Sequence, residues 1–276
     1  MTAPHHSRAR RWIITVVGHL VALLMFFPIL WMVLTAFKAE IDAFTTPPEL
    51  VFEPTLRSFR DVFARGDYGT FALNSIIAAV GSTAIALVVA IPAAYRLAFF
   101  PTARTQFTLL WMISTKMMPA VGVLLPVYIF FQWTGLLDQV VGLMMIYTLM
   151  NLPLAVWMLY TYFREIPYEM LEAARVDGAG LGSELRHILI PTAMPGVAST
   201  ALLCTILAWN ESFWSLQLMN VQGATLATFI SSFKAAEGMF WAKMSAASVL
   251  AIGPIIAIGW LAQKQLVRGL TFGAVK

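Results

Sequence analysis

The sequence predicts an all-α membrane protein that crosses the bilayer six times, and three observations support this fold class. Hydrophobic residues make up 59% of the 276 residues and charged residues only 12%, whereas soluble domains carry about 25% charged residues. A soluble core of this size could not bury so much apolar surface. Six apolar stretches are each long enough to cross the hydrocarbon layer as a helix, which takes about 20 residues. This composition excludes soluble disulfide scaffolds, disordered regulators and nucleic-acid-binding modules.

The predicted spans are helices because backbone N–H and C=O groups in hydrocarbon must be satisfied within one segment. They cover residues 12–37, 71–94, 107–131, 140–162, 195–218 and 244–261. The expected organisation is an N-terminal tail with the first helix (1–38), an outer loop (39–70), a core of five helices (71–264) containing a cytoplasmic loop (163–194), and a C-terminal tail (265–276). We expect the outer loop to be ordered and to lie over the outer mouth.

The distribution of basic residues predicts the orientation. If the N-terminus lies inside, the inner segments contain eleven Lys and Arg residues and the outer segments six. The positive-inside rule then places both termini in the cytoplasm. Proline removes a backbone donor, and the pair Pro119 and Pro126 in the third span could break a helix along a cavity. Isolated prolines are also common in plain membrane helices, so both interpretations stay open.

The cytoplasmic loop between the fourth and fifth spans has a distinctive pattern. Pro167 is suited to the first position of a helix over 168–176. Gly178 accepts the left-handed conformation that ends helices. A second short helix is expected through Leu185 and Leu189, ended by Pro191. By shape alone, the loop could equally be an amphipathic linker that lies on the membrane.

The residues of this loop carry a family resemblance. Glu172-Ala173-Ala174-Arg175-Val176-Asp177-Gly178-Ala179, followed by Leu185, Ile188, Ile190 and Pro191, resembles the EAA loop of ABC importer permeases. The family usually has phenylalanine where this chain has Leu185, and leucine where it has Ile190. The resemblance implies the type I ABC importer permease fold, in which this loop is the coupling helix that sits in a groove of an ATPase subunit. The coupling residues it implies are Glu172, Ala173, Ala174, Asp177, Gly178 and Ala179.

Further segments are similar to one branch of that family. The outer Thr46-Pro47-Pro48 and the tail from Leu266 to Lys276 look like the carbohydrate importers. The segments 111–123 and 208–214 are similar to mannitol and sorbitol permeases. The resemblance therefore implies a bacterial inner-membrane permease for a sugar alcohol, whose C-terminal tail also touches the ATPases. A permease of the same family for another sugar is the alternative.

The resemblance also implies partners and excludes a cofactor in this chain. The sequence has no G-x-x-x-x-G-K-[ST] loop to hold phosphates, so ATP and Mg²⁺ are expected on partner ATPases. The implied partners are a second homologous permease, two ATPase subunits, a periplasmic or lipid-anchored binding protein and membrane lipid, with no nucleic acid. An ion-coupled secondary transporter remains a competing class, but no inverted repeat or intramembrane carboxylate chain supports it. We expect neither catalytic residues nor a metal site.

The candidate substrate-pathway residues lie in the third, fourth and fifth spans. Lys116 is nine residues into its span, about 14 Å deep at the helical rise, and could donate to sugar hydroxyls, form a structural pair or extend to water. Glu211 and its neighbours could bind a sugar or form an aromatic interface belt. Asn151 could simply join two helices. The full candidate set is Lys116, Asn151, Trp209, Asn210, Glu211 and Trp214.

Overall fold

The computed structural model describes residues 8–235 and 238–272, and they form two compact units. The first unit contains the chain up to Gly66 and residues Ser232–Leu250. The second contains Asp67–Ser231 and the chain from Ala251 on. Secondary structure in the described residues is helical apart from one antiparallel pair of two-residue strands, β1 (Lys234–Ala235) and β2 (Gly238–Met239).

In the first unit, polar side chains hold the N-terminal end of a third helix close to other parts of the unit. It contains α1 (Arg8–Ala36), the 3₁₀ turn η1 (Asp42–Phe44), α2 (Arg57–Arg65) and the first residues of α13 (Trp241–Phe272). The Glu40 carboxylate accepts the backbone N–H groups of Ala242 (3.1 Å) and Lys243 (3.3 Å), and so caps α13. The Lys243 side chain forms an ion pair with Asp61 at 3.1 Å. The segment expected to be an ordered loop therefore contains the helix α2.

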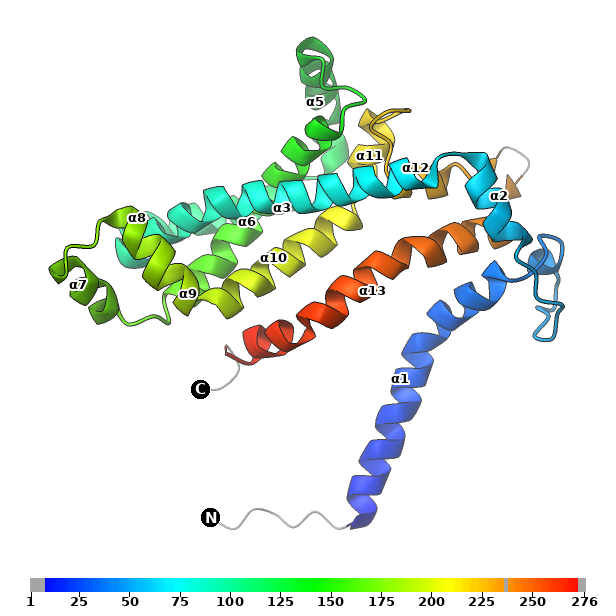
Figure 1. Ribbon diagram of the computed structural model, residues 1–276, viewed down its shortest axis with the longest axis horizontal. Coiled ribbons are helices and arrows are strands. Elements are labelled where there is room, and N and C mark those ends of the chain that lie inside the picture. Colours follow the sequence, from blue (N-terminus) through cyan, green and yellow to red (C-terminus); the bar gives the residue numbers. More distant parts are fainter. Residues whose placement is uncertain (1–7, 236–237, 273–276) are drawn as a thin grey trace. The chain divides into compact units, whose positions relative to one another are not determined.

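The second unit is built on three long helices that pack against one another: α3 (Tyr68–Phe99), α6 (Val140–Phe163) and α10 (Met194–Trp209) (Figure 1). Its other elements are α4 (Thr105–Ser114), η2 (Thr115–Met117), α5 (Ala120–Thr134), α7 (Tyr168–Val176), α8 (Leu181–Ser183), the π-helical turn η3 (Glu184–Leu189), α9 (Ile190–Thr192), α11 (Phe213–Leu218) and α12 (Leu226–Ser231). Small buried residues let the long helices approach closely. A Cβ added at Gly196 of α10 would clash with the Tyr162 ring of α6.

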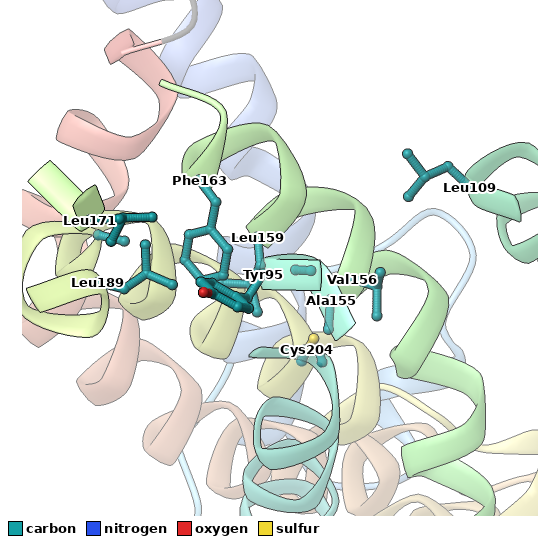
Figure 2. Packing of buried hydrophobic residues seen from close by; sticks show 12 residues of the cluster. Tyr95, Leu109, Ala155, Val156, Leu159, Phe163, Leu171, Leu189 and Cys204 are labelled. Carbon is teal, nitrogen blue, oxygen red and sulfur yellow. The ribbon is translucent and has the colours of Figure 1, made fainter. Parts of the chain in front are cut away.

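Two apolar clusters form the core of the second unit. One joins the ends of α3 and α6 to the loop that follows α6, and Figure 2 shows Tyr95, Phe163, Leu171 and Leu189 grouped there. The other lies near the opposite ends of these helices and includes Trp214. The loop after α6 is thus anchored in the core.

Three of the six expected spans are single helices that are long and apolar enough to cross a membrane: Trp12–Ala36, Tyr68–Phe99 and Val140–Phe163. The third and fifth expected spans are not single straight helices. Within the third, the stretch Thr105–Met117 meets Ala120–Thr134 at 89°. The fifth begins just after an 82° bend between Leu181–Thr192 and Met194–Trp209, and its helix α10 stops at Trp209, before α11 starts at Phe213. The last expected span lies in α13, whose described apolar part is Trp241–Ala257. Counting each bent pair as one span gives up to five candidates in the described residues.

Local backbone chemistry explains the break in the third expected span and the early end of the helix in the fifth. Pro119 has no backbone N–H, and a residue before proline is pushed out of the helical region. Met118 accordingly has φ −71° and ψ 126°. Pro126 remains inside α5, so only the first proline of the pair breaks the span. In the fifth span the helix ends at Trp209, because Asn210 turns its side-chain amide back to the Ile206 carbonyl (2.8 Å).

Candidate functional site

The EAA-like loop begins as the sequence predicts. The helix α7 spans Tyr168–Val176, with Pro167 just outside it at the N-cap. It ends at Asp177, and Gly178 adopts the left-handed conformation at φ +85°. Glycine is required here in practice, because this φ costs other residues about 1–2 kcal/mol.

The second half of the loop differs from the expectation. The elements α8, η3 and α9 follow one another without a break as far as Thr192, so Pro191 does not end this helix. Pro191 is instead the last residue but one of this continuous helical stretch. The change of direction comes two residues later, before α10.

The loop is packed into the core rather than laid on a surface. Leu171 and Leu189 are fully buried in the cluster that contains Phe163. Ala174, one of the expected coupling residues, is 7% exposed and belongs to this packing. Burial of the apolar side of α7 against the chain's own core excludes the interpretation of a loose membrane-surface linker.

An ionic clamp, which the sequence analysis missed, fixes the two halves of the loop to each other. Arg175 of α7 donates Nε to Oε2 of Glu184 (3.0 Å) and Nη2 to Oε1 (2.9 Å). Tyr95 of α3 donates its hydroxyl to Glu184 Oε1 (2.7 Å) and accepts from Arg175 (2.9 Å). Arg175 also donates to the Tyr168 hydroxyl (2.9 Å). We call Arg175, Glu184 and Tyr95 the ionic clamp, which joins α7, η3 and the end of α3.

The charges of the clamp stabilise each other. Glu184 is 2% exposed. Its hydrogen bonds with Arg175 lower the pKa of the carboxyl below the usual glutamate value, against the opposing effect of burial. The same bonds raise the pKa of Arg175. Because Glu184 is buried and the Arg175 side chain is 32% exposed, loss of Arg175 would leave a buried negative charge uncompensated.

The opposite side of the loop presents an exposed surface. Glu172, Ala173, Asp177 and Gly178 are exposed, and Val176 is 86% exposed. Val176 was not among the expected coupling residues, although an apolar side chain in full solvent on a rigid loop is typical of a contact surface. Ala179 is partly exposed.

Three of the candidate substrate residues meet at one small cavity in the second unit. Lys116 lies in η2, at the break of the third expected span, and donates Nζ to the Met150 carbonyl (2.9 Å). Asn151 and Glu211 line the same cavity of about 90 Å³. A cation, an amide and a carboxylate around one opening could bind hydroxyl groups.

The other candidates have structural contacts. Asn151 donates its amide to the Cys204 carbonyl of α10 (3.1 Å), so it joins two helices. Trp214 is 3% exposed within the core and does not line this cavity, and its place on the substrate pathway stays a prediction. Trp209 packs against the same core cluster. The side-chain amide of Asn210 donates a hydrogen bond to the Ile206 carbonyl of its own helix.

A second carboxylate, also missed, holds a loop between α11 and α12. Asp138 accepts the backbone N–H groups of four consecutive residues, 220–223, at 2.8–3.2 Å. Burial alone would raise the pKa of Asp138, but these four N–H groups outweigh it and lower the pKa. Asn74 of α3 donates to the carbonyls of Gln222 (2.8 Å) and Ala224 (2.9 Å). The loop 219–225 is therefore fixed at its backbone.

Two expected features fall on or beside residues that are not described. Of the C-terminal tail, α13 continues to Phe272, and residues 273–276 lie outside the described residues. Residues 1–7 of the N-terminal tail also lie outside them. The orientation of the two termini therefore stays a prediction.

Comparison with known proteins supports the family resemblance that the EAA-like loop carries. Residues 86–271 match the family described as "Binding-protein-dependent transport system inner membrane component". The trehalose transport system permease protein SugB of Mycobacterium tuberculosis is 33% identical over 98% of both chains. The probable ABC transporter permease protein y4oR of Sinorhizobium fredii is 31% identical over 97% of this chain and 96% of the relative.

The fold is also that of a solved transporter. A crystal structure of a bacterial ABC transporter involved in the import of the acidic polysaccharide alginate matches with a TM-score of 0.75, over 95% of this chain and 99% of that chain, at 22% identity. At this identity the match speaks for the fold alone. With the family match and its apolar helices, the chain is a multi-pass membrane protein that belongs to the inner membrane components of binding-protein-dependent ABC transport systems.

Proposed function

We propose that this chain is a permease subunit of an ABC importer for carbohydrates, and that its substrate is a sugar alcohol of the mannitol or sorbitol type. The observation that carries the transport role is the loop 163–194, which is buried on one side and exposed on the other. The exposed coupling surface contains Glu172, Val176 and Asp177. A braced loop with such a surface can receive force from a partner.

The ionic clamp gives this surface a mechanical connection to the rest of the subunit. Because Arg175 and Glu184 tie α7 to η3, and Tyr95 ties both to α3, a push on α7 is passed to a long helix rather than absorbed by the loop. Movement of α3 relative to α6 and α10 would then change access to the cavity.

The proposed partners follow from the family. ATP and Mg²⁺ are bound by two ATPase subunits, whose grooves receive α7, and this chain hydrolyses nothing itself. A second homologous permease completes the pathway, and a periplasmic or lipid-anchored protein delivers the substrate. We propose six spans with both termini in the cytoplasm, the third span being broken at Pro119.

Carbohydrate as the substrate class is supported by relatives whose names include trehalose, trehalose/maltose and diacetylchitobiose transport. The polyol proposal rests on two segments, 111–123 and 208–214. They contribute Lys116 and Glu211 to the same cavity. At about 90 Å³ this cavity is smaller than the roughly 300 Å³ of small-molecule sites. It would therefore form one wall of a site that the partner permease completes.

An uptake assay in cells that express the complete transporter tests the coupling role. Glu172→Lys reverses a charge in the middle of the exposed surface, and we expect it to abolish uptake without lowering the amount of protein in the membrane. Glu53→Lys makes the same change at an exposed position of the outer loop, and should leave uptake unchanged. Normal uptake by Glu172→Lys would refute the coupling assignment.

The same assay tests the energy source and the substrate. Uptake should continue when a protonophore collapses the ion gradient and stop when ATP is depleted; the reverse would favour an ion-coupled transporter. Unlabelled mannitol or sorbitol should compete with labelled mannitol, whereas trehalose and maltose should not. Competition by the disaccharides alone would replace the polyol proposal with another sugar.

A further inference from the structure

A cavity of about 410 Å³ lies in the first unit, among α1, η1 and the start of α13. Its walls include Trp31 and Thr35 of α1, Asp42 of η1, and Trp241 of α13. The volume falls within the roughly 300–1,000 Å³ of small-molecule sites. Because α1 is long enough to span a membrane and the cavity adjoins its last turns, the cavity lies near the polar boundary of the bilayer, where tryptophans gather.

The cavity contains a buried positive charge. Lys38 is 2% exposed, donates Nζ to the Glu49 carbonyl at 2.5 Å, and lies 4.8 Å from the ring centre of Trp31 and 5.1 Å from that of Phe52. The ion pairs in the described part of the chain are Arg175–Glu184 and Lys243–Asp61, so Lys38 has no carboxylate partner there. An ammonium has three N–H groups, and a buried charge without a counterion is costly. An anionic oxygen in the cavity would remove this cost.

A purely anionic ligand would not fit, because Asp42 lines the same cavity. It is half-buried, four residues along the chain from Lys38, and would repel a second negative charge. A ligand with a phosphate and an ammonium close together would satisfy both residues. The tryptophan faces in the wall would also attract the ammonium.

We propose that this cavity binds the headgroup of a phosphatidylethanolamine molecule from the surrounding bilayer. The phosphate accepts from Lys38 Nζ, and the ammonium lies at Asp42 against the tryptophan rings. The acyl chains have a path, since Leu24, Phe27 and Leu30 of the adjoining turns of α1 are exposed. This site is separate from the coupling loop and does not depend on the proposed function.

Native mass spectrometry of the chain, purified with the subunits that accompany it and then partly delipidated, tests the site. The wild type should retain phosphatidylethanolamine in preference to phosphatidylglycerol. Lys38→Gln should lower retention of both lipids about tenfold, as expected for loss of a charge-assisted hydrogen bond. Asp42→Asn should lower the ratio of phosphatidylethanolamine to phosphatidylglycerol by a similar factor. Arg60→Gln, at an exposed position of α2, should change neither quantity.

Three outcomes would overturn the proposal. One is a wild type that retains phosphatidylglycerol preferentially, and another is a lipid ratio that Asp42→Asn leaves unchanged. The third is a melting temperature raised by soluble O-phosphoethanolamine but not by the lipid, which would make the ligand a soluble metabolite. If Lys38→Gln does not assemble, the half-buried Asp42→Asn decides the question alone.

Discussion

Two loops of the second unit are each fixed by one carboxylate, but the carboxylates bind different groups. In the coupling loop, Glu184 binds the side chains of Arg175 and Tyr95. In the loop 219–225, Asp138 binds only backbone N–H groups. The first arrangement joins three separate elements, whereas the second fixes the shape of a single segment.

Because of this difference, we expect the coupling loop to transmit movement to other helices and the loop 219–225 only to be held in place. A side-chain clamp between α7, η3 and α3 makes these elements move together, which is what a coupling device needs. A carboxylate enclosed by consecutive N–H groups resembles an anion in a backbone nest, and its effect stays local. Disruption of Glu184 should therefore affect transport through distant helices, and disruption of Asp138 should affect mainly its own loop.

The largest effect is expected from Arg175→Ala. It leaves the buried carboxylate of Glu184 without its cation, which costs about 3–5 kcal/mol for a fully buried pair, and the 32% exposure of the Arg175 side chain places this case near the low end. We expect a melting temperature lowered by several degrees and ATP hydrolysis that continues without uptake. Arg186→Ala, an exposed arginine on the same loop, should change neither.

A double-mutant cycle separates the clamp from its individual residues. Arg175→Ala, Glu184→Gln and the double variant are compared by melting temperature and by uptake. If the clamp couples the residues, the double variant should lose less than the sum of the single losses. Additive losses would show that the two residues act independently.

The clamp also predicts a pH dependence. Since the folded-state pKa of Glu184 is lowered, its contribution is fully present above the unfolded glutamate pKa of about 4.3. It is lost as pH falls through the lower folded value. The difference in melting temperature between wild type and Glu184→Gln should stay constant from pH 8 to about 5 and narrow below that.

Asp138→Asn should have a smaller and more local effect. The amide replaces one acceptor oxygen with a donor, which leaves N–H groups of residues 220–223 without a partner at a cost of about 1–2 kcal/mol. Asparagine keeps the left-handed backbone that Asp138 adopts at φ 57°. Hydrogen exchange of residues 219–224 should accelerate about tenfold, while uptake is largely retained. Glu53→Gln at an exposed outer position is the control; loss of uptake with unchanged exchange would contradict the local role.

The two loops also differ in how far the sequence predicts them. The coupling loop is recognisable because Pro167 and Gly178 impose backbone conformations that few other residues allow, and α7 follows the predicted range 168–176. Asp138 leaves no pattern, because its partners are backbone groups that every residue except proline has. The clamp is equally hidden, since Tyr95 lies 80 residues before Arg175.

Apolar run length predicts where helices cross the membrane but not where they break. The predicted third and fifth spans, 107–131 and 195–218, extend across Met118–Pro119 and Asn210. The breaks come from a missing N–H and from a side-chain amide that binds its own helix. For the same reason Trp214, placed in a span by its neighbours, is a core residue beyond the break.

The smallest predicted effect tests whether the shape of the coupling loop depends on one backbone angle. Gly178 has φ +85°, and no atom lies within 4 Å of a Cβ added there, so Gly178→Ala introduces backbone strain without a clash. We expect it to cost about 1 kcal/mol. Gly182 of α8 has equal space and no positive φ, so Gly182→Ala should be neutral or stabilising by about 0.5 kcal/mol. The two melting temperatures should therefore move in opposite directions or differ by a few degrees. Equal shifts would mean that the loop relaxes at Gly178, in which case the clamp alone maintains its shape.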